Sequence, residues 1–124
     1  MKNSDNQFIK MTIEEILERT GGEIQCGAHR KFDKVDRAFC SDLMSDVLTL
    51  GCQEVLLITG LANVQAIRTA EMADISHILF VRDKNITEEM IQLAAENDMI
   101  LVKCKSSMFK VAGELFAAGI KPVY

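Results

Sequence analysis

Apolar residues form three short continuous runs in the second half of the chain. The runs are EVLLIT, HILFV and MILVKC, and they begin at residues 54, 77 and 99. Strands that are apolar throughout, without alternation, are typical of a sheet buried on both faces. A stretch with helical spacing follows each run, so the pattern predicts βα repeats joined by right-handed crossovers. We expect an α/β layered domain with a mostly parallel sheet.

The three helices that follow these runs have recognisable ends. Asn63 or a neighbour caps NVQAIRTAEMA, and Thr87 caps TEEMIQLAAEND. Ser106 or Ser107 caps SSMFKVAGELFAAG, and Gly119 closes it. Short hydroxyl and amide side chains accept hydrogen bonds from the unpaired amides of a first helical turn.

The first half of the chain is less regular. Residues 1–10 are predicted to be a flexible leader, and residues 11–124 a single domain. Thr12 and Glu15 have capping-box spacing at the start of a predicted helix over 13–20, and the pair Gly21 and Gly22 ends it. EIQCG is predicted to be a short strand.

A charged loop leads to a second short strand, at roughly residues 35–39. A further helix follows, with Leu43, Val47 and Leu50 on one face. Ser41 or Asp42 stands at its expected N-cap.

Composition restricts the classes of function. The 124 residues carry a net charge of −4, which argues against sequence-independent nucleic-acid binding. No apolar run approaches the ~18 residues that a membrane span needs. The polar start MKNSDNQFIK lacks the apolar centre of a signal peptide, so we expect a cytoplasmic protein.

The ends of the predicted parallel strands indicate where a ligand would bind, because ligands gather at the carboxyl edge of such sheets. Gly60 allows close approach of backbone, Arg82 or Lys105 supplies a cation, and a helix start at Ser106 favours an anion. The alternative is that these residues are ordinary helix caps and solvated loop residues. The candidate ligand-binding residues are Ser41, Asp42, Thr59, Gly60, Asn63, Arg82, Lys105, Ser106 and Ser107.

The four cysteines, Cys26, Cys40, Cys52 and Cys104, have no C-x-x-C spacing and fit no common zinc or iron–sulfur pattern. Buried free thiols are the favoured interpretation. Cys40 and Cys104 follow predicted strands, where a thiolate or a metal could be held, so a redox or metallocluster role for these two is the alternative.

Catalytic templates are missing from the sequence. It contains neither a Walker phosphate loop, G-x-x-x-x-G-K-[ST], nor G-x-G-x-x-G. His29 and His77 fall on different predicted elements without a recognised spacing to a carboxylate or cysteine. We therefore expect a non-enzymatic protein with no required cofactor.

The segment Glu18-Arg19-Thr20-Gly21-Gly22 resembles the motif that names the DRTGG domain family, with Glu in place of Asp. The order of elements over residues 10–122 is similar too. The resemblance implies a fold like that of the HPr kinase/phosphorylase N-terminal domain. Because a helix precedes the glycines and a strand follows them, the motif is expected to be a structural helix end and not a phosphate loop.

DRTGG domains are known as small α/β modules, some fused to pyrophosphatases with nucleotide-sensing domains, and their own activity is generally unassigned. Stand-alone members that resemble this chain tend to occur beside iron-only hydrogenase genes. The leading hypothesis is thus a regulatory module that senses a small anion or nucleotide. A homodimer is expected from the family context and from Phe109, Phe116 and Tyr124 near the end of a small chain. A structural interaction partner for a hydrogenase-related protein is a further alternative.

Overall fold

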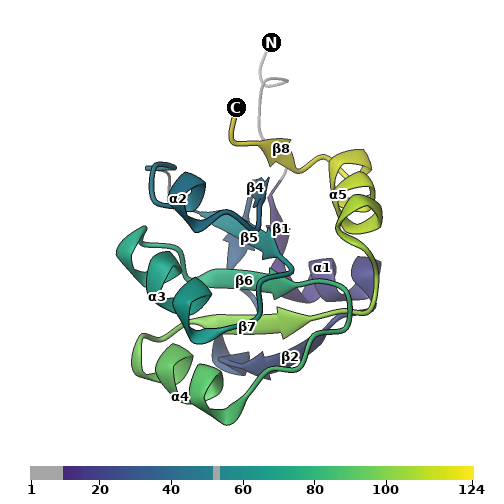
Figure 1. Cartoon of the computed structure of the whole chain (residues 1–124). Helices are drawn as coiled ribbons and strands as arrows, with labels where there is room; N and C mark the ends of the chain where they lie inside the picture. Colours follow the sequence, from purple (N-terminus) through teal and green to yellow (C-terminus); the bar gives the residue numbers. More distant parts are fainter. Residues whose placement is uncertain (1–9, 52–53) are drawn as a thin grey trace.

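The structure is a computed structural model that describes residues 10–51 and 54–124. These residues form a layered α/β domain with helices on both faces of a six-stranded sheet (Figure 1). The predicted fold class is confirmed. Most of the predicted leader and Cys52 lie outside the described residues.

The sheet has the strand order β2-β7-β6-β5-β4-β8. The strands span Glu23–Cys26 (β2), Ile100–Lys103 (β7), His77–Phe80 (β6), Val55–Thr59 (β5), Arg37–Cys40 (β4) and Lys121–Pro122 (β8). Strands β4 to β7 are parallel, and β8 adds to β4 in parallel as well. Only β2 runs antiparallel, against β7, among the described strands of this sheet. The predicted mostly parallel arrangement is correct, whereas the pattern gave no sign of β8.

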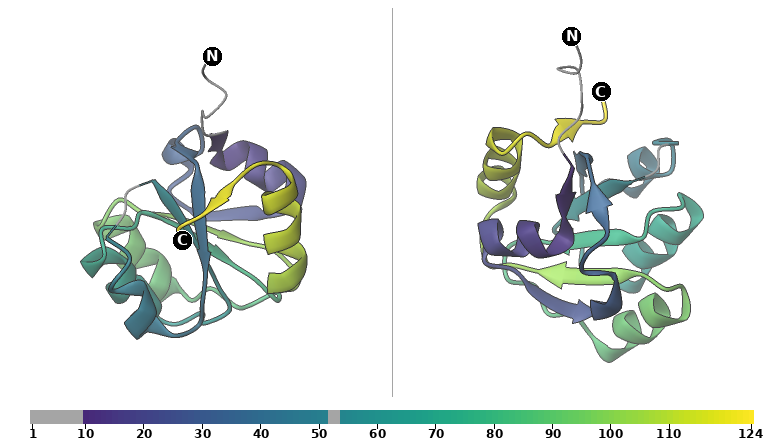
Figure 2. Two further views of the ribbon diagram at one scale, coloured as in Figure 1. Left: turned by 90° about the horizontal axis from the view of Figure 1, so that it is seen from above. Right: turned by 180° about the vertical axis from the view of Figure 1, so that it is seen from behind.

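Helices cover the two faces of the sheet unequally (Figures 1 and 2). One face holds α1 (Ile13–Thr20) and α5 (Met108–Ala117), and the other holds α2 (Met44–Val47), α3 (Val64–Met72) and α4 (Glu88–Glu96). On β5, Leu56 and Ile58 enter the core under α1 and α5, while Leu57 enters the core under the other three helices. Both faces of the strand are therefore buried, which accounts for its continuous apolar run.

Two short strands from the first half of the chain form a second, smaller sheet. Strand β1 (Met11–Thr12) pairs antiparallel with β3 (Lys34–Val35), and a 3₁₀ turn, η2 (Ala28–Arg30), lies between them in sequence. The single strand predicted near 35–39 is thus two strands. The break at Asp36 separates β3, which pairs with β1, from β4, which pairs with β5.

Side-chain caps fix the starts of four helices. At α1 the Thr12 hydroxyl accepts from the Glu15 N–H at 3.1 Å, and the Glu15 carboxylate accepts from the Thr12 N–H at 2.8 Å. This is the predicted capping box. The other three caps are Asn63 (α3), Thr87 (α4) and Ser107 (α5), each accepting from a first-turn amide.

The Glu18–Gly22 segment ends α1 and positions β2. Gly21 adopts the left-handed conformation, with φ at 71°, and donates to the Leu17 carbonyl at 2.8 Å. A Cβ on Gly22 would lie 3.0 Å from side-chain atoms of Leu17 and Val102, so this glycine allows the helix end to pack close to β7. Glu18 and Arg19 are exposed. The glycines thus make the turn between helix and strand.

The helix predicted after β4 is much shorter than expected, and its predicted caps are wrong. Leu43, not Ser41 or Asp42, stands at the N-cap of α2, and it makes no side-chain cap. The Ser41 hydroxyl accepts from the Leu43 N–H at 2.9 Å, ahead of the helix. The Asp42 carboxylate is bound to the end of β5 instead.

In the part of the chain that is described, no helix has the length and apolar character that a membrane crossing requires.

Candidate ligand-binding site

The crossovers of the sheet reverse between β6 and β7. The chain passes from β4 through α2, β5, α3, β6 and α4 to β7 over one face, and then returns through α5 to β8 over the other (Figure 1). The segments after β6 and β7, residues 81–84 and 104–107, consequently leave the sheet on opposite sides. In open α/β sheets a ligand binds at this kind of reversal, at the carboxyl ends of the strands.

At this edge the Asp42 carboxylate binds three donors from neighbouring segments. Its Oδ1 accepts from the Gly60 N–H at 2.7 Å and from the Thr59 hydroxyl at 3.0 Å. Its Oδ2 accepts from Arg82 Nη2 at 3.1 Å. The ends of β4, β5 and β6 are thereby joined through one carboxylate, across as many as 40 residues of sequence.

The three donors keep Asp42 ionised. Burial by itself raises the pKa of a carboxyl group, but the hydrogen bonds from Gly60, Thr59 and Arg82 outweigh it and hold the pKa of Asp42 below its ordinary value. The side chains of Asp42 and Arg82 remain 45% and 44% exposed. The ion pair is accordingly open to solvent and to competing ions.

Gly60 makes room for the Arg82 guanidinium. A Cβ at this position would lie 3.0 Å from Nη1 of Arg82 and closer still to the rest of that group. The guanidinium therefore lies against the backbone at the end of β5. A bulkier residue here would displace Arg82 from Asp42, because the flexible side chain yields more easily than the buried strand.

The loop after β6 has an unusual backbone. Arg82 and Asp83 both have positive φ, at 68° and 54°, although neither is glycine. Each such residue costs about 1–2 kcal/mol of backbone energy. Two hydrogen bonds of 2.9 Å hold the loop in place, from the Arg82 N–H to the Ser106 carbonyl and from the Asp83 N–H to the Cys104 carbonyl. Strained backbone of this kind concentrates at functional sites.

The nine predicted residues do not all converge. Asp42, Thr59, Gly60 and Arg82 form one cluster, and Ser106 joins it through its backbone carbonyl. The other four are at the same carboxyl edge with different local roles: Ser41 bonds to the loop before α2, Asn63 and Ser107 cap helices, and Lys105 is exposed.

Lys103 is a further cation at this edge and is not among the nine predicted residues. It is the last residue of β7, and its Nζ donates to the Lys84 carbonyl at 3.2 Å and lies 3.8 Å from Asp83 Oδ1. A lysine inside an otherwise apolar strand was the available signal, because such a residue needs a polar exit for its ammonium group. Together with Arg82 it gives this edge of the sheet two cations.

The two cysteines of the alternative hypothesis are far apart in the sheet. Cys40 ends β4 and is exposed, whereas Cys104 follows β7 and is buried, with β5 and β6 between those strands. At about 4.8 Å per strand, three strand spacings are too wide for one metal ion. Burial raises the pKa of the Cys104 thiol, which disfavours the thiolate. Within residues 10–51 and 54–124, no three His, Cys, Asp or Glu side chains are grouped to hold a metal.

A second polar cluster lies at the opposite, amino-terminal edge of the sheet. His77, at the start of β6, contacts Asp33 at 3.0 Å, and Arg30 donates to the same carboxylate oxygen at 2.6 Å. The sequence separation of 44 residues hid this pairing. Arg30 also donates to the Asp98 carbonyl at 2.7 Å, so the cluster ties the η2 segment to the turn before β7.

This cluster makes stability depend on pH near neutrality. Burial lowers the pKa of His77, and the Asp33 contact only partly opposes it. A histidine with a depressed folded-state pKa gives stability that is present above its ordinary value of about 6.5 and is lost as the pH falls through the folded value. We expect a lower free energy of unfolding at about pH 5.5 than at about pH 7.5. Urea titrations of the wild type and His77→Gln measure it, and an equal pH dependence in both would contradict the assignment to His77.

Replacing Asp42 by asparagine should weaken the cluster modestly. The amide oxygen keeps an acceptor for Gly60, but the charge that attracts Arg82 is lost. Because both side chains are nearly half exposed, we expect a loss of up to about 1 kcal/mol at neutral pH. The lowered pKa of Asp42 means that this difference disappears as the pH falls below about 4. Urea denaturation at several pH values is the measurement, and a difference that persists in acid would contradict it.

Comparison with known proteins finds a likeness in fold. No family model matches the chain, and no curated protein matches it in sequence. Among solved structures, it is similar to the CBS and DRTGG domains of the regulatory region of Clostridium perfringens pyrophosphatase, complexed with the activator diadenosine tetraphosphate. The TM-score is 0.69 at 16% sequence identity.

The match covers 90% of this chain and 48% of that chain, so the protein spans about half the length of that regulatory region. At this identity the likeness shows a shared fold and nothing finer. It supports the DRTGG-related fold that the Glu18–Gly22 segment indicated.

Proposed function

We propose that this protein is a non-catalytic regulatory module that binds a small anion or a nucleotide at the carboxyl ends of β5, β6 and β7. The ligand's negative group takes the place of the Asp42 carboxylate. It receives the hydrogen bonds of the Thr59 hydroxyl, the Gly60 N–H and the Arg82 guanidinium. Asp42 then acts as an internal competitor that occupies the site until a ligand displaces it.

The observation that carries this proposal is the convergence of three donors on one negative charge. A backbone amide, a hydroxyl and a guanidinium are the groups that proteins use to bind phosphate and carboxylate. The ion pair is nearly half exposed, so a ligand has access to it. The reversal of the crossovers and the strained residues Arg82 and Asp83 lie at the same edge.

The likeness in fold supports a regulatory role. The matched region belongs to the regulatory part of a pyrophosphatase and was complexed with a nucleotide activator. The nucleotide is therefore the first ligand class to examine here. We retain the predicted cytoplasmic location, the homodimer and the link to a hydrogenase-related protein as parts of the proposal. Pull-down of a hydrogenase subunit by the purified chain would test that link.

Thermal denaturation with phosphate, AMP, ATP and diadenosine tetraphosphate tests the ligand site. A ligand at one hundred times its dissociation constant stabilises the folded state by about 2.7 kcal/mol. We expect Asp42→Asn to bind an anion more tightly than the wild type, because a competing negative charge is removed. Arg82→Gln is expected to lose the stabilisation. The Asp42→Asn change thus lowers stability without ligand and increases the gain on adding it.

The matched control is Arg68→Gln, which removes the same charge from an exposed position in the middle of α3. It should respond to ligands as the wild type does. Absence of stabilisation by any of these anions at millimolar concentration, in both the wild type and Asp42→Asn, would overturn the proposal. An equal response in Arg82→Gln and Arg68→Gln would place binding elsewhere.

A further inference from the structure

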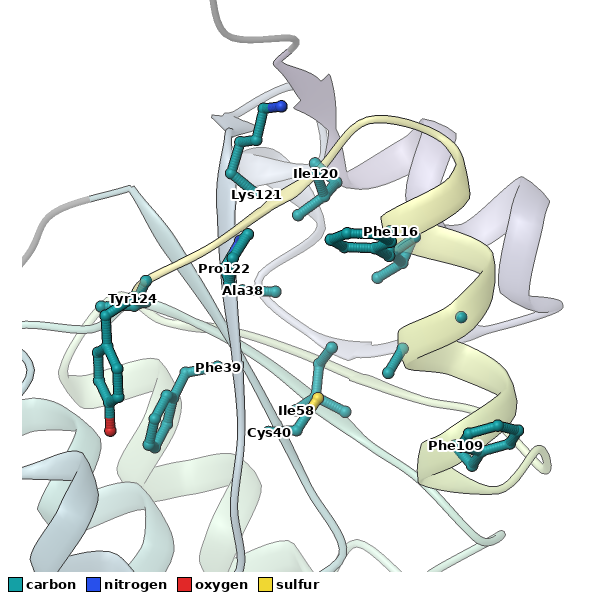
Figure 3. A pocket seen from close by; sticks show the side chains of 14 residues that line it. Ala38, Phe39, Cys40, Ile58, Phe109, Phe116, Ile120, Lys121, Pro122 and Tyr124 are labelled. Atoms are coloured by element: carbon teal, nitrogen blue, oxygen red, sulfur yellow. The ribbon is translucent and has the colours of Figure 1, made fainter.

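An apolar groove runs between α5, the sheet and the end of the chain. Its volume is about 420 Å³. Phe109 and Phe116 project from α5, and Ile58 and Cys40 come from β5 and β4, whereas the Tyr124 ring lies beside Phe39 across β4 from α5 (Figure 3). Of the described residues that line the groove, Lys121 alone carries a charge.

The aromatic side chains of this groove are exposed to an unusual degree. Phe109 is 89% exposed and Phe116 69%. With 150–250 Å² for each aromatic side chain, the two phenylalanines present roughly 300 Å² of apolar surface. A standard protein interface buries about 800 Å² on each partner. These two side chains supply more than about a third of that area, and the apolar walls of the groove add to it.

Gly113 lies between the two phenylalanines on α5, and no contact within the described chain accounts for it. A Cβ at this position would meet no atom within 4 Å. Glycine is among the least favourable residues in the interior of a helix. Residues three and four apart lie on one helix face, so Phe109, Gly113 and Phe116 form a stripe with a low step at its centre. A low step between two large side chains allows another helix to approach closely.

We infer that the groove is the interface of a two-fold symmetric dimer, with a second copy of this chain as its occupant. The inference rests on the homodimer of the proposed function and locates its interface. In a two-fold interface the same surface meets itself, so it must carry both projections and a hollow to receive them. This surface has both: the phenylalanines of α5 and the groove beside them. The α5 helices cross at Gly113, and Phe116 of each copy enters the groove of the other.

The acidic balance of the chain does not oppose self-association through this face. The chain has a net charge of −4, so two copies repel each other on average. The described lining of the groove contains no acidic side chain. Pairing through this face therefore brings no acidic side chains of the groove lining together.

Sedimentation velocity of the full chain at several micromolar concentrations, without added ligand, tests the interface. We expect the wild type to be a dimer. Phe116→Asp should raise the dissociation constant of the dimer by at least about tenfold, as loss of a central aromatic residue does in other interfaces. Gly113→Gln should do the same by blocking close approach of the helices, and the helix propensity of Gln makes the folded monomer more stable.

The control is Phe32→Asp, at an aromatic residue that is 64% exposed and does not line the groove. It should remain dimeric. Circular dichroism and thermal denaturation of each variant establish that it is folded, and Gly113→Gln keeps the test decisive if Phe116→Asp fails to fold. A wild type that stays monomeric overturns the inference. This holds even if the groove turns out to bind a small apolar molecule instead of a second copy. A dimer that survives both groove substitutions overturns it as well.

Titration of the same samples with phosphate and nucleotides separates this inference from the ligand site. A monomeric wild type that binds an anion overturns only the interface. A groove-dependent dimer that binds none of these anions overturns only the ligand site and leaves the interface supported.

Discussion

Replacing Gly27 by alanine should destabilise the protein by more than about 3 kcal/mol, among the largest effects of any single substitution. Gly27 follows β2 and has a φ of 81°, in the left-handed region. A Cβ here would lie 2.8 Å from Ile100 Cα and closer still to the Met99 carbonyl oxygen. Both are backbone atoms at the start of a buried strand and cannot move aside cheaply. The free energy of unfolding in urea measures the effect.

Gly21→Ala is the matched control for this substitution. Gly21 also has a left-handed φ, of 71°, but a Cβ there meets nothing within 4 Å. The cost should therefore be limited to the backbone strain of alanine, about 1–2 kcal/mol. The difference between the two variants isolates the contact of Gly27 with β7. Equal losses of stability in the two variants would show that the backbone of Met99 and Ile100 moves aside and that Gly27 is not closely packed against it.

Phe80→Ala should cost about 3–5 kcal/mol. Phe80 ends β6, has no exposed surface, and packs in the core under α2, α3 and α4. Truncation removes a large apolar side chain and leaves a cavity that the surrounding strands and helices fill only in part. Because helices cover both faces of the sheet, apolar side chains enclose this cavity, and water does not fill it. Urea denaturation of the variant gives the cost directly.

Phe32→Ala provides the comparison for Phe80→Ala. Phe32 is mostly exposed, and its ring lies 5.2 Å from Lys31 Nζ. An exposed contact of this kind contributes about 0.5–1 kcal/mol, so we expect a loss of no more than that. A Phe80→Ala variant as stable as Phe32→Ala would mean that the core under the three helices is not closely packed.

The sequence predicted the elements whose signals are local. Capping residues such as Thr12, Thr87 and Ser107 bond within their own first helical turn, so their spacing along the chain is sufficient to find them. The continuous apolar runs correctly predicted that the central strands are buried on both faces. The left-handed glycine after α1 was visible as a double glycine following a helical pattern.

The errors concern residues whose partners are distant in sequence. Asp42 has the composition of a helix cap, but its carboxylate binds Gly60 and Arg82, and α2 begins without it. Strand β8 contains only two residues and pairs with β4 after a crossover of the whole sheet, so no periodicity marks it. The contact of His77 with Asp33 was hidden for the same reason.

The candidate site was predictable as an edge but not as an arrangement. The rule for parallel sheets selected residues that all lie at the carboxyl ends of strands. It did not show that Asp42 itself would occupy the donors of Thr59, Gly60 and Arg82, because that depends on the neighbouring positions of β4, β5 and β6. Phe109 and Phe116 show the same limit. Their helical spacing fits a core face as well as an exposed one.

Helix α5 connects the candidate ligand site with the apolar groove. Its first turn follows Ser106, whose carbonyl accepts from the Arg82 N–H, and its outer stripe carries Phe109 and Phe116. In the proposed dimer, an anion that shifts the loop at Arg82 would act through this hydrogen bond on the helix that faces the second copy. Linkage requires reciprocity: a ligand that tightens association by some factor is itself bound more tightly, by the same factor, in the associated form. If both proposals hold, α5 and its connections to β7 and β8 are the segment through which ligand binding and association would be coupled.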